Sequence, residues 1–433
     1  MSNDLAKWAK DRGVKYFLVS FTDLVGFQRA KLVPAQSIGD VTKNGAGFAG
    51  FAAGFIVPPS TPDMLGTPDA DTVIQLPWKP EVAWLASNCS IDGKSLEQAP
   101  RNILVRLVEE AAKDGLRIKT GVEPEFFFLS PDGHKIADPL DVSKKPCYDQ
   151  QAIMRRYDVI AEVCDYMLDL GWGPYQSDHE DANGQFEMNW KFDDALKTAD
   201  KLAFFKFMMR SVAEKHGLRV TFMAKPFIDL TGSGLHAHVS GWSLDGKTNT
   251  FADESRELGL SQQGRNFLAG VMKHAPGSTA IQNPTVNSYK RLNAPTTASG
   301  ATWAPSKVTW SGDNRTHYVR VPGGRMELRS PDSSNPYLLH AVIIAAGLDG
   351  VRNKLEPADP LYINMAVEGH TVKDATRLPL NLLDALRAYE ADSTLRGMLG
   401  EDFSEAYLAL KHKEWHSYVS HMSSWEIDNY VDV

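Results

Sequence analysis

The stretch GVEPEFFF, residues 121–128, decides the fold class, because two glutamates one residue apart precede a run of phenylalanines. On a β-strand, alternate residues leave from the same face, so Glu123 and Glu125 point in one direction. The phenylalanines indicate apolar surroundings, in which an unpaired charge is costly. We therefore expect a strand in apolar surroundings whose two carboxylates are neutralised by a partner.

Three other strand-like segments carry polar residues in a similar pattern. They are GSGLHAHVS (232–240), RMELRS (325–330) and SDHEDANGQFEMNW (177–190), and they supply His236, His238, Glu327, Glu180 and Glu187. Each pattern alone is more often a solvated face. Together, the carboxylates and one imidazole would need a divalent cation to be tolerable in one sheet. Oxygen-rich ligands favour Mg²⁺, with Mn²⁺ as the alternative, over Zn²⁺ or copper.

Arginines complement this acidic set. They crowd between positions 291 and 329 of a chain whose net charge is −8, and they are Arg291, Arg315, Arg320, Arg325 and Arg329. Such a cluster suits phosphate oxygens and a substrate carboxylate. Metal ligands and arginines without a Ser-His-Asp set indicate phosphoryl transfer. There is no GxxxxGK[ST] loop and no kinase signature, so an ATP site must use another architecture.

The pattern along the chain predicts an α+β protein of two domains. Residues 1–97 read as a small β-rich domain, with a strand–turn–strand at 14–35, a loop at 45–55 and strands at 73–78 and 81–91. Residues 98–433 form the larger domain. It has helices at 101–116, 150–170, 194–217 and over the last fifty residues, and strands at 118–130, 184–190, 219–226, 234–241 and 317–329.

Bulk properties exclude several classes of protein. An acidic chain is not a typical nucleic-acid binder. Three scattered cysteines form no zinc or disulfide pattern, and the start carries no apolar signal segment, so we expect a cytoplasmic protein. The apolar run at 338–347 is too short to span a bilayer and is predicted to be a buried helix.

Five motifs in order resemble the glutamine synthetase superfamily over nearly the whole chain. They are GxExEFF (121–127), HE…GQxE (179–187), GSGxHxHxS (232–240), NSYKRL (287–292) and NRTHYVRVP…RxExRxPD (314–332). The resemblance implies an N-terminal β-grasp domain and a catalytic domain with a curved antiparallel sheet flanked by helices. It also implies a dodecamer of two stacked hexameric rings, with active sites between subunits.

The resemblance further assigns roles to individual residues. One metal ion would be held by Glu125, Glu180 and Glu187, and the other by Glu123, His236 and Glu327. The nucleotide and phosphate contacts would be His238, Ser240, Phe192, Arg315, Arg320 and Arg325. The glutamate contacts would be Arg291, Arg329 and Gly232. Arg315, Glu187 and Trp303 are expected nearest the reacting groups. The implied reaction attacks ATP with the γ-carboxylate of glutamate, and an amine then displaces phosphate from γ-glutamyl phosphate.

The sequence departs from ordinary glutamine synthetases at both acids that bind ammonium. No acid occurs from Val41 through Pro62, where the family has an Asp, and none occurs between Arg291 and Asp313, where it has a flap Glu. Trp303 falls at the flap position. Ammonium needs hydrogen-bond acceptors, whereas aromatic walls hold the methyl group of an alkylammonium ion. Candidate wall residues are Phe48, Phe51, Phe55 and Trp303, and Tyr148 is expected to contact the substrate.

The sequence thus resembles the glutamate–methylamine ligase branch more than ordinary glutamine synthetase. Ammonium and other amines, including polyamines, stay open as acceptors. Tyr148, Glu180 and Glu187 are candidates for removing the amine's proton, and nothing in the sequence selects among them. A structural protein without activity is the remaining class. It would need broken metal ligands, and here all six positions are filled.

Overall fold

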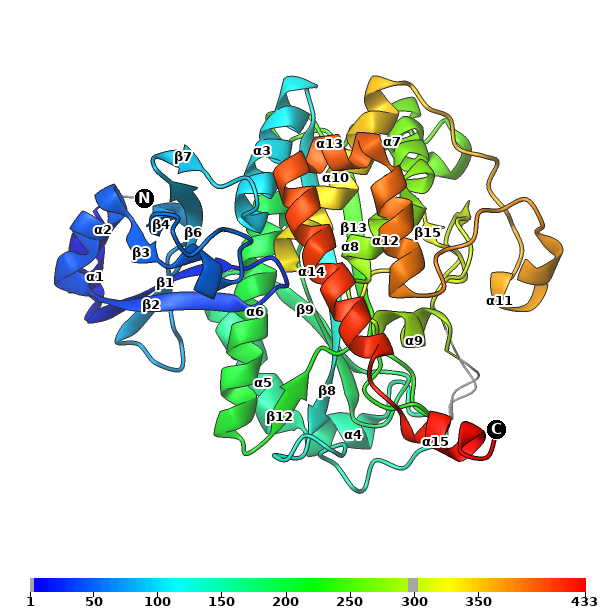
Figure 1. Cartoon of the computed structure of the whole chain (residues 1–433), viewed down its shortest axis with the longest axis horizontal. Helices are drawn as coiled ribbons and strands as arrows, with labels where there is room; N and C mark the ends of the chain where they lie inside the picture. Colours follow the sequence, from blue (N-terminus) through cyan, green and yellow to red (C-terminus); the bar gives the residue numbers. More distant parts are fainter. Residues whose placement is uncertain (1–3, 295–302) are drawn as a thin grey trace.

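The computed structural model describes residues 4–294 and 303–433 (Figure 1). Its N-terminal sheet has the order β2 (Gln28–Pro34), β1 (Tyr16–Thr22), β6 (Val82–Ile91), β4 (Met64–Pro68) and β3 (Ala46–Phe48). The short strands β5 (Ile74–Gln75) and β7 (Lys94–Ser95) also pair with β6. Helices α1 (Leu5–Arg12) and α2 (Ile38–Asn44) lie at the outer end of this unit (Figure 1).

The β1–β2 hairpin is closed by local hydrogen bonds in the DLVG turn. The carboxylate of Asp23 accepts from the backbone N–H groups of Val25 and Phe27, and Gly26 takes a positive φ of 95°. A glycine is suited to that conformation because it has no Cβ. The hairpin brings Phe21 into the core, where its ring packs edge-on against Phe48 at 4.9 Å between centroids.

A second, larger sheet carries most of the polar motifs. Its order is β14 (Trp310–Ser311), β15 (Val319–Arg320), β16 (Met326–Leu328), β13 (Leu235–Trp242), β8 (Arg117–Leu129), β10 (Gln185–Trp190) and β9 (Pro174–His179). β11 (Asp193–Asp194) and β12 (Arg219–Thr221) pair with the two ends of β8. The ladders are antiparallel except the short β14–β15 pair, which is parallel. β8 is therefore the strand around which the sheet is built.

Helices cover the sheet and form the rest of the core. The most buried is α10 (Pro336–Arg352), which packs against α3 (Pro100–Lys113), α6 (Ala195–Lys215), α7 (Gln262–Lys273) and α8 (Ala275–Gln282). The remaining helices are α4 (Gln150–Arg155), α5 (Tyr157–Asp169), α9 (Ser288–Leu292), α11 (Met365–Glu368), α12 (Leu382–Ala391), α13 (Ser393–Leu399), α14 (Glu401–Val419) and α15 (Ser424–Tyr430). The C-terminal α15 lies across the molecule from the N-terminal sheet (Figure 1).

A buried guanidinium joins the two sheets. Arg101 of α3 donates to Asp69 and Asn88 of the N-terminal unit at 2.8 and 2.6 Å, and to both carboxylate oxygens of Asp200 in α6 at 3.0 Å. Tyr337 of α10 also donates to Asp200 at 2.8 Å. Breaking a buried pair of this kind is strongly destabilising, because it leaves an uncompensated charge. The network therefore fixes the N-terminal unit against the helices behind the larger sheet.

The structure confirms the α+β class and the buried helix at 338–347, and it corrects three local predictions. The expected loop at 45–55 contains β3 and a 3₁₀ turn (Gly50–Ala53). The strand expected at 219–226 ends at Thr221. The strand expected at 317–329 is split into β15 and β16, because Pro322 precedes two glycines with φ of 79° and 60°. Among the described residues, no helix has the length and apolarity that a bilayer crossing needs.

Candidate active site

The register of four neighbouring strands assembles the acidic and histidine side chains. Between β8 and β13, Glu123 lies opposite His236, and between β8 and β10, Glu125 lies opposite Glu187. Between β13 and β16, His238 lies opposite Glu327. Directly opposed residues have Cβ atoms about 5 Å apart, so residues far apart in the chain become neighbours on one face. The sequence patterns at 121–128 and 232–240 are thus parts of one site.

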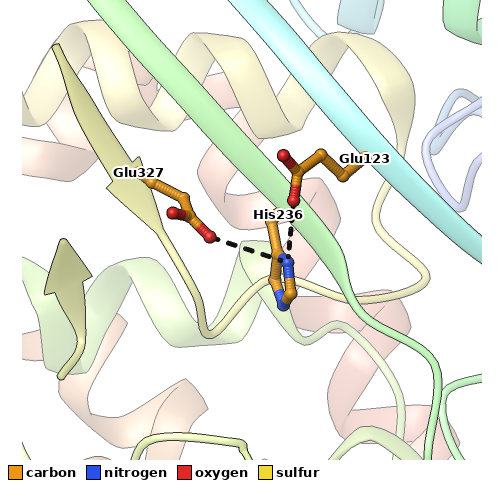
Figure 2. A group of neighbouring side chains, drawn as sticks. All are labelled: Glu123, His236 and Glu327. Atoms are coloured by element: carbon orange, nitrogen blue, oxygen red, sulfur yellow. Dashed lines mark hydrogen bonds and ion pairs between the residues drawn. The ribbon is translucent and has the colours of Figure 1, made fainter. Parts of the chain in front are cut away.

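The first group of candidate metal ligands is Glu123, His236 and Glu327, whose donor atoms lie within 4.8 Å of one another. Figure 2 shows His236 between the two glutamates, with Nδ1 at 3.3 Å from Glu123 and 3.8 Å from Glu327. Burial would raise the pKa of Glu123, but hydrogen bonds with His236 and His238 hold it below the usual value. Glu123 is therefore an anion in this site.

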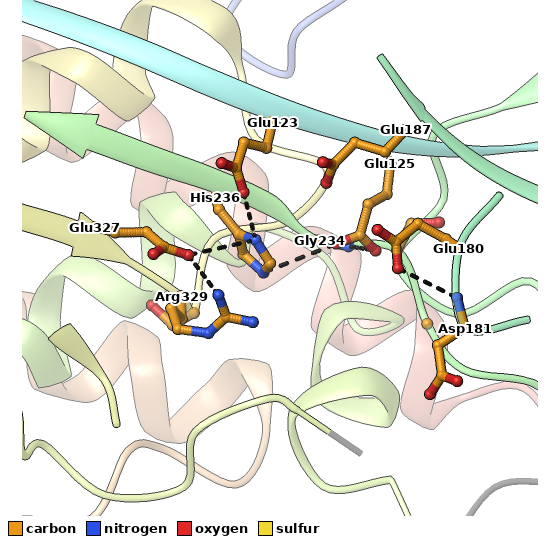
Figure 3. Close-up of polar contacts among 12 residues, drawn as sticks. Glu123, Glu125, Glu180, Asp181, Glu187, Gly234, His236, Glu327 and Arg329 are labelled. Atoms are coloured by element: carbon orange, nitrogen blue, oxygen red, sulfur yellow. Dashed lines mark hydrogen bonds and ion pairs between the residues drawn. The ribbon is translucent and has the colours of Figure 1, made fainter. Parts of the chain in front are cut away.

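Two further groups lie beside the first. Glu125, Glu187 and His236 form one set within 4.8 Å, which shares His236 with the first group (Figure 3). Asp178, Glu180 and Glu187 form the other set. Burial and the neighbouring carboxylates raise the pKa of both Glu180 and Glu187. The positively charged side chains of the protein thus do not neutralise the negative charge of this carboxylate cluster.

The surplus of negative charge tests whether these residues fit divalent metal ions. Buried carboxylates that repel one another become favourable ligands once a cation lies between them. The donor set is carboxylate oxygen with one imidazole, which suits Mg²⁺ or Mn²⁺. The predicted set Glu123, His236 and Glu327 forms one group of the structure, whereas the predicted set Glu125, Glu180 and Glu187 is divided between two groups that share Glu187, one of them including Asp178.

A cavity of about 480 Å³ opens on one side of Glu123. Phe192 stacks on Trp242 there at 6.0 Å between centroids, and Lys119 Nζ lies 4.2 Å from the Trp242 ring. Trp242 Nε1 donates to the Ser240 hydroxyl at 2.9 Å. Flat aromatic faces and cations suit a heteroaromatic ring bearing phosphates. His238, Ser240, Phe192 and Arg325 all line this first cavity, as predicted for nucleotide contacts.

A second cavity of about 330 Å³ opens on the other side of Glu123. Arg291 and Arg329 line it, and Arg291 is buried with Nη1 donating to the carbonyl of Ser330 at 2.7 Å. A Cβ on Gly234 would lie 2.8 Å from Arg291 Nη2 and 2.9 Å from His236 Nε2. The glycine therefore lets the backbone pass between the arginine and the metal ligands. Buried guanidinium groups at a cavity wall suit a small dianion.

Other predicted residues are placed differently. Arg315 lines the second cavity instead of the first, and Tyr148 and Trp303 lie with it. Arg320 lines neither cavity, because its guanidinium is paired with Glu327 at 2.6 Å and with Asp313 at 2.5 Å.

The aromatic wall expected from the N-terminal unit needs a correction. Phe48 and Phe55 are buried in its core, while Phe51 is half exposed and lines neither cavity of its own chain. Residues 295–302 of the expected flap segment lie outside the described residues.

Sequence reasoning missed several contributors to the site. Asp178 lies opposite Glu187 in the β9–β10 ladder and belongs to the same group of candidate metal ligands. Its position two residues before Glu180 is the feature of the sequence that could have identified it. Gln185 donates to Glu125 at 3.1 Å and to the carbonyl of Gly232 at 3.2 Å, and it stands inside the quoted GQxE motif. Lys119 and Trp242 gave no signal, because neither belongs to a motif.

Comparisons with known proteins agree with this geometry. The family model for the glutamine synthetase catalytic domain matches residues 97–430. A protein named glutamine synthetase from Rhizobium leguminosarum bv. phaseoli is 64% identical over 435 residues, covering 100% of both chains. A glutamate–methylamine ligase from Methyloversatilis universalis is 41% identical over 99% of both chains. A solved structure titled "GmaS/ADP complex-Conformation 1" is 56% identical, with a TM-score of 0.97 and 100% coverage of both chains.

Proposed function

This chain belongs to the glutamine synthetase family and is an ATP-dependent carbon–nitrogen ligase acting on glutamate, and from that premise we propose that its acceptor is methylamine. The products are γ-glutamylmethylamide, ADP and phosphate. The observation that carries the proposal is the half-exposed Trp303 ring on the wall of the second cavity. It presents an apolar face where ordinary glutamine synthetases place a glutamate.

The two cavities divide the substrates between them. ATP binds in the first cavity, with its base against Phe192 and Trp242 and its phosphates toward His238 and Arg325. Glutamate binds in the second, with its α-carboxylate on Arg291 and Arg329 and its chain along Gly232. Glu123 lines both cavities, so the γ-phosphate and the γ-carboxylate meet beside it. This arrangement positions the two reactants, which is most of what phosphoryl transfer needs.

The six predicted ligands, with Asp178, hold two Mg²⁺ ions in the working enzyme. When bound, the ions neutralise charge on the phosphates and the carboxylate. Gln185 and the backbone N–H of Gly234 fix Glu125 by hydrogen bonds of 3.1 and 2.8 Å. Arg320 and Arg329 hold Glu327 in the same way from the other side. These contacts fix the orientation of the Glu125 and Glu327 carboxylates, whose oxygens are the proposed metal ligands.

The second cavity also offers groups that attract a cationic amine. Asp178, Glu180 and Asp181 line it together with Tyr148 and Trp303. Acids favour any ammonium ion, whereas apolar aromatic faces favour one that carries a methyl group. Arg315, which lines the same cavity, would stabilise the negative charge that develops on the acyl phosphate.

The proposal also includes the assembly of several subunits into an oligomer. Among the described residues, Phe51 lines neither of the two cavities of its own chain, so it would reach an acceptor site as a neighbouring subunit's residue. We propose a dodecamer of two hexameric rings, with 1–97 as the N-terminal domain and 98–433 as the catalytic domain. The three cysteines are unpaired, in keeping with the cytoplasmic location that we propose.

Phosphate release with Mg²⁺, ATP and glutamate tests the function. Methylamine, ethylamine, ammonium, a polyamine and no amine are compared at equal concentrations. The proposal expects the highest kcat/KM for methylamine. Ammonium is the second candidate, favoured by the name of the 64% identical relative, and a preference for it would refute the methylamine assignment.

A further inference from the structure

His179 is a buried histidine that lines neither cavity, although it directly precedes the ligand Glu180. Both of its ring nitrogens face acceptors. Nδ1 lies 2.6 Å from the carbonyl oxygen of Pro146, and Nε2 lies 2.7 Å from Asp141 Oδ2. The side chain thus links Asp141 and Pro146, two points of the 138–148 segment.

Asp141 continues this link toward the metal ligands. Its carboxylate accepts from the backbone N–H of Gly184 at 2.6 Å and from the Asn183 side chain at 2.8 Å. Asn183 and Gly184 form the turn between Glu180 and Glu187. The pair formed by His179 and Asp141 therefore joins the 138–148 segment to the turn that carries two ligands of the site.

The same histidine holds a strained residue of the second cavity. Tyr148 has a φ of 64°, in the left-handed region that a bulky side chain rarely adopts. Its N–H donates to the carbonyl of His179 at 2.8 Å, and the His179 ring holds the carbonyl of Pro146. His179 thus contacts the chain on both sides of Cys147, at the Pro146 carbonyl and at the Tyr148 N–H. Cys147 and Tyr148 line the second cavity together with Trp303.

We propose that His179 and Asp141 are positioning residues that hold the Cys147–Tyr148 wall in register with Glu180 and so set the width of the acceptor pocket. This inference rests on the proposed function, because it treats the second cavity as the place where the amine meets the acyl phosphate. Neither residue touches a substrate. A loosened wall weakens amine binding while nucleotide binding, on the far side of Glu123, is unaffected.

Two substitutions of His179 separate its two bonds. In His179→Gln, the amide nitrogen reaches the place of Nε2, which keeps the Asp141 bond and loses the Pro146 bond. In His179→Asn, it falls at the place of Nδ1, which keeps the Pro146 bond and loses the Asp141 bond. Steady-state kinetics on the purified oligomer should show an amine KM raised about tenfold in His179→Gln, with the ATP KM within about twofold of wild type. His179→Asn should raise the amine KM less.

His274→Gln is the matched control. His274, like His179, is buried, has an acceptor at each ring nitrogen and lines neither cavity; its partners are the carboxylates of Asp349 at 2.9 Å and Asp392 at 2.5 Å. It should lower the melting temperature without changing the amine KM. A His179→Gln enzyme that behaves like this control, with unchanged KM values and only a lower melting temperature, would overturn the inference.

Two further outcomes are distinguishable. If His179→Gln does not fold, Asp141→Asn takes its place. It keeps the volume and weakens the other bond of His179, so the amine KM should rise as in His179→Asn, and an unchanged amine KM there overturns the inference. If the wild-type enzyme prefers ammonium, the proposed function fails. The KM for ammonium is then measured in place of that for methylamine, and the same comparison of His179→Gln with His274→Gln tests the positioning role.

Discussion

Replacing Trp303 tests whether an aromatic wall selects the acceptor. The side chain is 46% exposed within its own chain and lines the second cavity, so part of its ring is open to a ligand there. Burying one methyl group contributes about 0.8 kcal/mol. The attraction of about 1 kcal/mol between a cation and the ring acts on ammonium and methylammonium alike, so it does not discriminate between them. The methyl contribution alone corresponds to about a fourfold preference for methylamine over ammonium.

The variant Trp303→Glu removes the methyl contact and adds a hydrogen-bond acceptor, so its ratio of kcat/KM for methylamine to that for ammonium should fall by at least about fourfold. Trp303→Leu is the control. It keeps an apolar wall and loses only the ring, whose attraction acts on both cations, so its ratio should stay within about twofold of the wild-type value. Both ratios are measured by ADP release at saturating ATP and glutamate. An unchanged ratio in Trp303→Glu, with normal KM values for ATP and glutamate, would remove the ring from the acceptor pocket.

Three other changes have defined outcomes. Glu327→Gln should reduce ATP turnover by at least about 100-fold, because it removes a charged ligand oxygen at nearly constant volume, and a phosphate-release assay with intact melting temperature would show it. Mg²⁺ should raise the melting temperature more at pH 8 than at pH 6, since the raised pKa of Glu187 means that binding displaces protons; an equal rise at both pH values would contradict this. Burial lowers the pKa of His340 to about 3, so below about pH 6.5 the unfolded chain binds a proton at this residue that the folded chain does not bind. The free energy of unfolding should therefore fall as the pH is lowered, and it should fall less in His340→Leu. Chemical denaturation of both proteins at about pH 5 and pH 7 tests this.

The ligand cluster was predictable because it depends on local geometry. Alternation along a strand is fixed by the backbone, so the spacing of Glu123 and Glu125, and of His236 and His238, already places each pair on one face. The structure adds only the register that brings these faces together. The order of the motifs then identified the other strands that carry site residues, because the resemblance to the family covers nearly the whole chain.

What escaped prediction depends on pairing across strands. Asp178 faces Glu187 through the β9–β10 ladder, and a single sequence does not show which residues of two strands are opposed. Arg320 was assigned to phosphates, but the β15–β16 register places it opposite Glu327. Phe48 and Phe55 were expected at a pocket wall, yet a short aromatic and glycine-rich segment reads equally well as loop or core, and here both rings are buried.

Glu123 borders both cavities and belongs to the first ligand group, so a single carboxylate forms the partition between them. Any change of charge on one side alters the electrostatic free energy of the other. Nucleotide binding and amino-acid binding should therefore be coupled, and thermodynamic linkage requires each to change the affinity for the other by the same factor. The concentration of either substrate in the cell would then alter how much of the other the enzyme holds.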